Sequence, residues 1–193
     1  RELRTIVLML AIVGTFGFNF PIFISTMSVS VFHADARSYG LLSSAMAIGS
    51  VTGALLAAGR RRASLRTVMT GAALFGLGAG LAALMPSYWL FGVCLVPVGV
   101  ASQTFMTTSN AAVQLSTEPA MRGRVMAIFL AVAMGGTPLG APVVGWVADH
   151  FGPRWAMGIA AAAGLIAAGL ALRHLASAGR VSREASSPSP RAP

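Results

Sequence analysis

Four arginines, Arg60, Arg61, Arg62 and Arg66, stand within seven positions between two apolar runs that are each long enough to cross a membrane. An arginine at the centre of a bilayer costs roughly 2.5–3.5 kcal/mol, so one helix carrying this block through lipid would lose on the order of 10 kcal/mol. The block therefore lies in water or among lipid headgroups. The flanking runs must be two separate helices that turn back on each other.

The composition indicates an integral membrane protein. Of 193 residues, 55% are hydrophobic and only 10% are charged, whereas a soluble domain has about 25% charged residues. The net charge of +9 does not indicate nucleic-acid binding, because the arginines fall between apolar runs and form no basic face with a recognition motif. The single Cys94 allows no disulfide framework and no cysteine-based metal site. We expect no metal and no cofactor.

About 20 apolar residues cross the hydrocarbon of a bilayer, and the sequence has six such runs. They are Thr5–Val31, Tyr39–Gly59, Thr67–Met85, Tyr88–Ala111, Val125–Ala148 and Trp155–Leu172. The chain begins with Arg1 and not with Met, which we interpret as a sign of a fragment. We predict a transmembrane bundle over residues 1–175 and, from its Pro/Ser-rich composition, a disordered cytoplasmic tail over 176–193.

The arginines also predict the orientation of these spans. Twelve of the fourteen lie at the N-terminus, in the second and fourth connections (the latter with Arg122 and Arg124) or in the tail, all on one side of the membrane. Only Arg37 and Arg154 fall on the other side. By the positive-inside rule the twelve are cytoplasmic. We therefore expect a multi-pass protein of the plasma or inner membrane with both termini in the cytoplasm.

A glycine motif occurs twice. Gly49 and Gly53 belong to a Gly-x-x-x-Gly-Ala sequence in the second span, and Gly136 and Gly140 belong to another in the fifth. This spacing lets two helix backbones approach closely. Both copies lie in the middle helix of a triplet, and the two middle helices run in opposite directions. The pattern predicts an all-α membrane fold of six helices arranged as a 3+3 inverted repeat, a device of secondary transporters.

The first and fourth spans carry polar stripes, each on one helix face. The stripes are Thr15, Asn19, Thr26 and Ser30 in the first span, and Gln103, Thr107, Asn110 and Gln114 in the fourth. Polar groups that faced lipid would be costly, so these faces are expected to look toward protein or a wet cavity. Lining of a substrate cavity and simple interhelical hydrogen bonding both remain open. For Asn110 and Gln114, nearer the cytoplasmic end, a structural role is at least as well supported.

Two stretches resemble a known family: GLLSSAMAIGSVTGALLAAGRRR and NAAVQLSTEPAMRGRVMAIFLAVAMGGTPLGAPVVGWVADHFGPRW. They are similar to the C-terminal half, helices seven to twelve, of a major facilitator superfamily transporter. The branch of drug and enterobactin exporters looks closest. The resemblance covers Leu3–Leu172 and implies half of a twelve-helix fold.

The resemblance also implies roles for particular residues. The family's cytoplasmic signature, Gly-x-x-x-Asp-Arg-x-Gly-Arg-Arg, matches Gly53 and Arg60–Arg62, but its acidic position falls on Ala57. The basic cluster is then an anchor for the other half or part of a gate. The exporters' helix-five motif, Gly-x-x-x-Gly-Pro-x-x-Gly-Gly, is approximated by a group in the fifth span, which favours export over import. The members of this group are Gly136, Gly140, Pro142 and Gly145.

The function implied is secondary active transport that exports small amphipathic molecules, of drug or siderophore type, by alternating access. Intramembrane carboxylates are the usual proton carriers, but no predicted span contains an Asp or Glu, and Asp149 stands only at the outer mouth of the fifth. We therefore expect the proton-coupling acid in an N-terminal six-helix half, the chain's partner besides lipid and a small-molecule substrate. The alternative is a six-span accessory or channel-like subunit without transport of its own. An enzyme is not expected, because the three histidines lie at span ends and form no catalytic motif.

Overall fold

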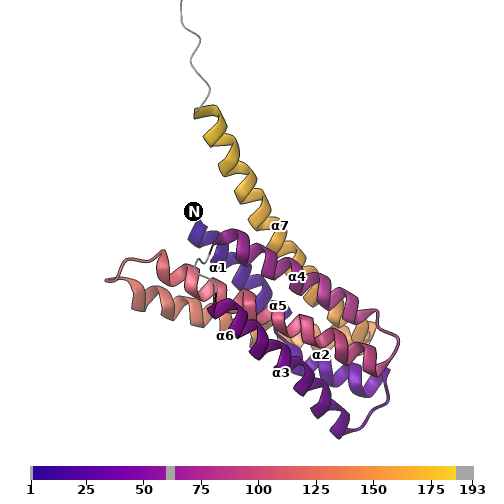
Figure 1. The fold of residues 1–193 in the computed structure, drawn as a ribbon. Helices are drawn as coiled ribbons and strands as arrows, with labels where there is room; N and C mark the ends of the chain where they lie inside the picture. The colour runs from indigo at the N-terminus through magenta and orange to yellow at the C-terminus, as the bar shows by residue number, and fades with distance from the viewer. Residues whose placement is uncertain (1, 60–63, 186–193) are drawn as a thin grey trace, which may run out of the picture.

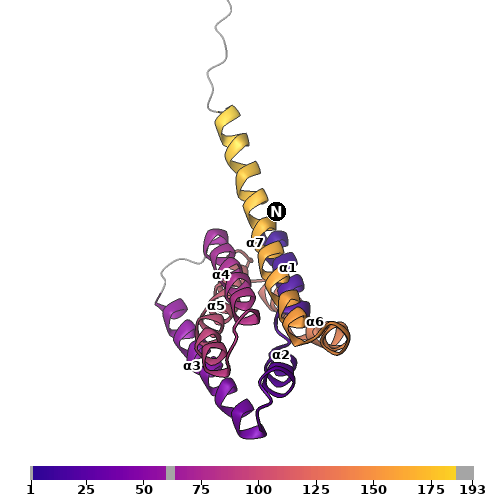
Figure 2. The same cartoon turned by 90° about the vertical axis from the view of Figure 1, so that its right-hand side faces the viewer.

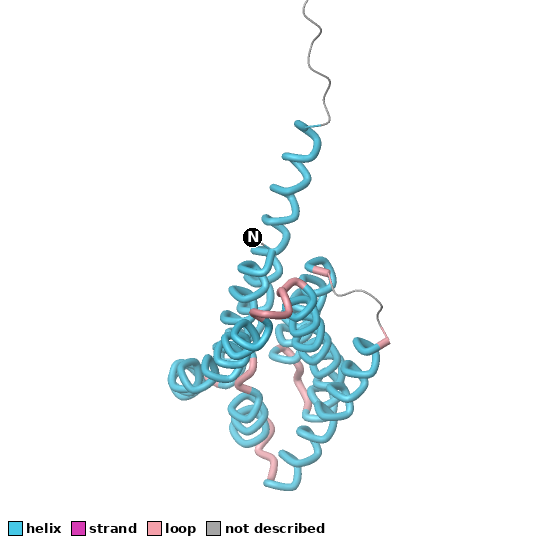
Figure 3. The backbone as a smooth tube through the Cα atoms, turned by 90° about the vertical axis from the view of Figure 1, so that its left-hand side faces the viewer, coloured by secondary structure: helices cyan, strands magenta, loops and turns pink. Residues whose placement is uncertain are grey.

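The computed structural model describes residues 2–59 and 64–185 and contains six helical spans that are long and apolar enough to cross a membrane. The spans are Glu2–Val31, Arg37–Ala58, Leu65–Ala83, Tyr88–Leu115, Arg122–Phe151 and Pro153–Ser177. Within the described chain these helices are joined by short loops, and no strand is present (Figure 3). The six predicted crossings are confirmed. Arg60, Arg61 and Arg62 lie outside the described residues.

Seven α-helices and two π-helical turns build these spans. In chain order they are α1 (Glu2–Ile12), η1 (Val13–Gly17), α2 (Phe20–Thr26), η2 (Met27–Val31), α3 (Ala36–Ala58), α4 (Leu65–Ala83), α5 (Tyr88–Leu115), α6 (Arg122–Phe151) and α7 (Pro153–Ala185). The first span therefore consists of four short pieces, whereas each later span is a single helix (Figure 1).

The first span, which the hydropathy predicts as one spanning helix, is broken at Phe18 and Asn19. Pro21 stands at the start of α2, where its missing N–H removes no helical hydrogen bond. An uninterrupted helix would instead place Pro21 in its interior and lose a bond there. The break at Asn19 thus follows from the position of the proline.

Side-chain caps start three of the helices. Asp35, Ser64 and Ser87 accept hydrogen bonds from backbone N–H groups in the first turns of α3, α4 and α5. The pKa of the Asp35 carboxylate is lowered from its ordinary value by two hydrogen bonds from Ser38. The backbone N–H of Ser38 has the larger effect, and its hydroxyl the smaller. These caps define where the chain re-enters each helix after a connection.

The middle helix of each triplet packs on the first span of the other triplet. A Cβ added to Gly53 would lie 2.5 Å from the backbone oxygen of Val100, and one added to Gly49 would overlap the carbonyl of Val96. In the second triplet a Cβ added to Gly140 would overlap the carbonyl of Thr15. The contact of α3 with α5 and the contact of α6 with η1 are therefore related by the repeat. The predicted 3+3 inverted repeat is confirmed.

The third helices of the two triplets, α4 and α7, pack against each other. Gly76 and Gly164 meet at this contact, because a Cβ added to Gly164 would lie 2.7 Å from the Cα of Gly76. The interface thus joins like helices of the two repeats through equivalent small residues. α7 also packs against α1 and η1 of the broken first span.

The last helix is longer than the sequence indicates. The composition predicts that the bundle ends at residue 175, but α7 continues to Ala185 and extends beyond the other helices (Figures 1 and 2). The segment after Leu175 includes alanine and arginine, which have high helix propensity, so it can prolong a helix that packing has already started. Residues 186–193 lie outside the described chain.

The glycine contacts predict opposite effects of one substitution at two positions of α6. Gly140→Ala should destabilise the protein by about 1–3 kcal/mol, because the added methyl group collides with the Thr15 carbonyl. Gly145→Ala should be neutral or stabilise by up to about 1 kcal/mol, because a Cβ there meets open space and alanine favours the helix. Unfolding of the detergent-solubilised variants measures both, and equal losses at the two positions would contradict the packing described.

Candidate functional site

A hollow of about 350 Å³ lies between the first two spans of each triplet. Its walls come from the break in the first span and from α2, α3, α5 and α6. The lining residues are Phe18, Phe20, Met46, Ser50, Ser102, Gln103, Met106, Ala133, Met134 and Thr137. None of them is ionisable. The hollow is therefore a neutral site with aromatic and thioether surface and a few hydrogen-bonding groups.

Phe18 and Phe20 form an ordered aromatic surface on the hollow. Their rings are stacked with centroids 5.9 Å apart, and Phe18 also meets Phe75 and Phe105 edge to face at 5.9 and 6.3 Å. Phe75 and Phe105 are fully buried. Such pairs are favourable beyond the burial of their area, so the core rings hold Phe18 in one position. A planar apolar group could stack on this surface.

Gln103 is the main polar group of the hollow. Its amide Nε2 donates to Thr107 Oγ1 at 3.3 Å, and among the described residues this is its only hydrogen bond. The amide oxygen and one N–H are then available to a bound molecule. The hydroxyls of Ser102 and Thr137 donate to the carbonyls of Gly99 and Gly14, at 3.0 and 3.1 Å. Those two side chains can still accept a hydrogen bond.

Asn19 lies at the break in the first span and is only 1% exposed. Its Nδ2 donates to the carbonyl of Thr15 at 2.7 Å, so the side chain bridges the break. Its Oδ1 is buried and has no partner among the described residues. Asn19 is not among the residues that line the hollow. In this structure it satisfies a backbone carbonyl that the interrupted helix would leave without a donor.

Apart from Ser30, which is exposed, the other residues of the two polar stripes bond within their own helices or pack against α6. Thr26 Oγ1 donates to the carbonyl of Ile22 at 2.7 Å, and Thr15 packs against the glycines of α6. Asn110 accepts a hydrogen bond from Gln114 through its side-chain oxygen. Gln103 lines the hollow, and Thr107 is hydrogen-bonded to Gln103. The full set of stripe residues that we predict as candidates for a substrate cavity is Thr15, Asn19, Thr26, Gln103, Thr107 and Asn110. The structure places the others outside the lining of the hollow.

Five lining residues from the second and fifth spans lie outside the polar stripes used for prediction. They are Met46, Ser50, Ala133, Met134 and Thr137. Ser50 and Thr137 each directly follow a glycine of the two packing motifs, and that adjacency is the signal that could have found them. Met46 and Met134 carry no such signal, because methionine is ordinary in any apolar helix.

The predicted anchor and packing residues lie away from the hollow. Arg122 and Arg124 are exposed at the start of α6, and Gln114 is exposed near the end of α5. Gly53 packs on the backbone of α5. Gly49, Gly136 and Gly140 also make backbone contacts, whereas Pro142 is exposed and Gly145 faces open space.

The fold and the hollow define a multi-pass membrane protein built as an inverted repeat of helix triplets. The model of the Major Facilitator Superfamily matches residues 6–193, so the chain belongs to this family. A search of curated proteins found no match.

Among solved structures, a mutant of the peptide transporter POT in complex with alafosfalin is similar in fold. The TM-score is 0.65 and the identity 15%, over 86% of this chain and 37% of that chain. At this identity the likeness shows the fold alone. The chain thus spans a little over a third of that transporter. The family points to a transporter and not to an enzyme.

The bridge across the first span predicts an unequal effect of two asparagine substitutions. Asn19→Ala should lower stability by about 1–3 kcal/mol, because it leaves the Thr15 carbonyl without a donor in a buried place. Asn110→Ala should change stability by less than about 0.5 kcal/mol, because it removes only an exposed side-chain pair. Thermal unfolding in detergent compares them. A larger loss for Asn110→Ala would count against the bridging role.

Proposed function

We propose that the chain is the C-terminal six-helix half of a secondary active transporter that moves small amphipathic molecules by alternating access. The observation that carries this proposal is the neutral hollow between the first two spans of each triplet. Transporters built from inverted repeats hold substrate near the membrane midplane at the repeat interface, where helices are interrupted. The broken first span and the helix α5 supply such a place here, with Phe18 and Gln103 as its aromatic and polar contacts.

The hollow suits amphipathic substrates of drug or siderophore type. Phe18, Phe20 and three methionines offer soft apolar contact, and Gln103 offers one strong point for a hydrogen bond. Sites of this kind, mostly apolar with few polar groups, are typical for small molecules. Thr15, Asn19, Thr26, Thr107 and Asn110 contribute to this site indirectly, by holding the broken span and by positioning the face of α5.

An N-terminal six-helix half completes the site in our proposal. The chain covers only 37% of the similar transporter structure, which supports a larger whole. The described spans contain no acidic residue in their apolar interiors, so we assign proton coupling to an acid of that partner half. The glycines and Pro142 of α6 favour export. The basic residues Arg122 and Arg124 anchor the cytoplasmic rim against the partner.

Substitutions in the hollow test the proposed transport in the whole transporter. Gln103→Leu should reduce efflux of an amphipathic dye such as ethidium about ten-fold, because loss of one good hydrogen bond costs about that factor. Phe18→Ala should also reduce efflux, by removing the stacking surface. Ile166→Ala serves as the control, because Ile166 is exposed on α7. Wild-type efflux by both hollow variants, at equal expression, would refute the site.

Cysteine labelling tests the proposed orientation, in which both termini are cytoplasmic in the plasma membrane. In a Cys94→Ser background, Pro86→Cys in the α4–α5 connection should react with an impermeant maleimide on intact cells. Pro119→Cys in the α5–α6 connection should react only after permeabilisation, because the positive-inside rule places it in the cytoplasm. Both prolines are exposed, so the pair is matched. The reverse pattern of labelling would invert the topology.

A further inference from the structure

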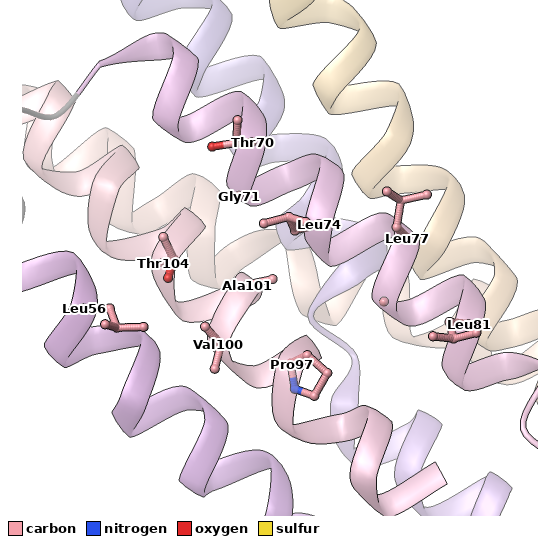
Figure 4. Close-up of a pocket in the computed structure, with 11 residues that line it drawn as sticks. Leu56, Thr70, Gly71, Leu74, Leu77, Leu81, Pro97, Val100, Ala101 and Thr104 are labelled. Atoms are coloured by element: carbon pink, nitrogen blue, oxygen red, sulfur yellow. The ribbon is translucent and has the colours of Figure 1, made fainter. Parts of the chain in front are cut away.

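A second hollow, a groove of about 420 Å³, lies over α5 between α3 and α4. Figure 4 shows Leu74, Leu77 and Leu81 of α4 along one wall, with Leu56 of α3 opposite. The remaining lining residues are Thr70, Gly71, Gly78, Pro97, Val100, Ala101 and Thr104. α4 and α5 pack closely beside the groove, because a Cβ added to Gly71 would lie 3.1 Å from the Cα of Phe105.

The groove and the candidate substrate hollow occupy opposite faces of α5. The hollow uses Ser102, Gln103 and Met106, whereas the groove uses four positions of the same helix, which are Pro97, Val100, Ala101 and Thr104. At 3.6 residues per turn the centres of the two sets are about 160° apart. The groove therefore faces away from the site assigned to substrate.

The groove lies in the hydrocarbon-facing surface of the bundle. Leu56, Leu74 and Leu77 on its rim are 55%, 61% and 59% exposed, and each belongs to a helix long and apolar enough to cross a membrane. Such side chains are stable in contact with lipid tails and not with water. An apolar depression in this surface must therefore be filled by an apolar chain.

A cation lies in line with the groove. Arg66 is exposed and stands one helical turn before Thr70, so positions 66, 70, 74, 77 and 81 share one face of α4. No ion pair of Arg66 is present among the described side chains. Because helical side chains tilt toward the N-terminus, Arg66 reaches from the groove toward the headgroup level. The N-terminus of α4 adds partial positive charge at the same level.

We propose that this groove binds one acyl chain of an anionic phospholipid whose phosphate is held by Arg66. From Thr70 to Leu81 the groove follows eleven helical rises, about 16 Å, which matches half of a hydrocarbon core about 30 Å thick. One chain of one leaflet thus fills it, with its headgroup beside the first turn of α4. Basic residues between spans at this depth bind anionic headgroups.

This inference does not depend on the proposed transport. It uses the outer face of α5 and the exposed face of α4, and neither contributes to the hollow that holds Gln103. Loss of dye efflux and loss of lipid binding can therefore be measured separately, and each can fail while the other holds.

Native mass spectrometry of the purified protein tests the lipid site, with phosphatidylglycerol and phosphatidylcholine added in equal amounts. The wild type should retain one phosphatidylglycerol in preference to phosphatidylcholine. Arg66→Gln should lower retention of phosphatidylglycerol about five-fold, as expected for one basic group near a headgroup, and leave phosphatidylcholine unchanged. Arg66→Lys should retain the preference. Leu74→Trp should lower retention of both lipids, because the indole fills the groove.

Two variants are matched controls. Arg4→Gln removes an exposed arginine at the start of α1, and Ile166→Trp adds an indole on the exposed face of α7. The proposal is overturned if the wild type retains both lipids equally, if Arg4→Gln acts as strongly as Arg66→Gln, or if the two Trp variants behave alike. A dimer that Leu74→Trp dissociates would assign the groove to a second copy instead. If Leu74→Trp does not fold, Leu77→Phe replaces it in the same groove.

Discussion

Contact of backbone with backbone, without intervening side chains, is the interaction on which the rest of this structure depends. Gly49 and Gly53 bring α3 against α5, and Gly136 and Gly140 bring α6 against the first span. Lipid tails are as apolar as leucine, so close van der Waals packing of this kind, and not the hydrophobic effect, holds helices together in a membrane. Because both contacts join the middle helix of one triplet to the first helix of the other, they also set the walls of the hollow.

The bilayer imposes a second constraint, because it offers no water to backbone groups that a helix leaves free. The first span meets it with an interrupted helix. Pro21 begins a new helix and cannot donate, the π-helical turns rearrange the bonds on either side, and Asn19 donates to the carbonyl of Thr15. The same break turns Phe18 and Phe20 toward the hollow. The interruption of the first span thus also places the aromatic surface of the candidate site.

Helix α5 separates two environments. One face presents Gln103 and its neighbours to the hollow, and the opposite face, which includes Pro97, forms the floor of the apolar groove beside α4. In the functions proposed above, substrate and phospholipid are therefore held by one rigid element that has no charged side chain on either face.

The sequence by itself determined the number of crossings, their approximate limits and the repeat, because hydropathy and the spacing of small residues are properties of a chain that must satisfy its own backbone in lipid. Gly49, Gly53, Gly136 and Gly140 could be selected as contact residues from spacing alone, and Gln103 from the polar face of its helix. Only the tertiary structure decided what each helix face meets. It placed Met46, Ser50, Met134 and Thr137 at the hollow, turned Asn19 inward to bridge a break, and left Gly145 without a contact. Periodicity shows which residues share a face of one helix, but the partner of that face depends on how six helices pack together.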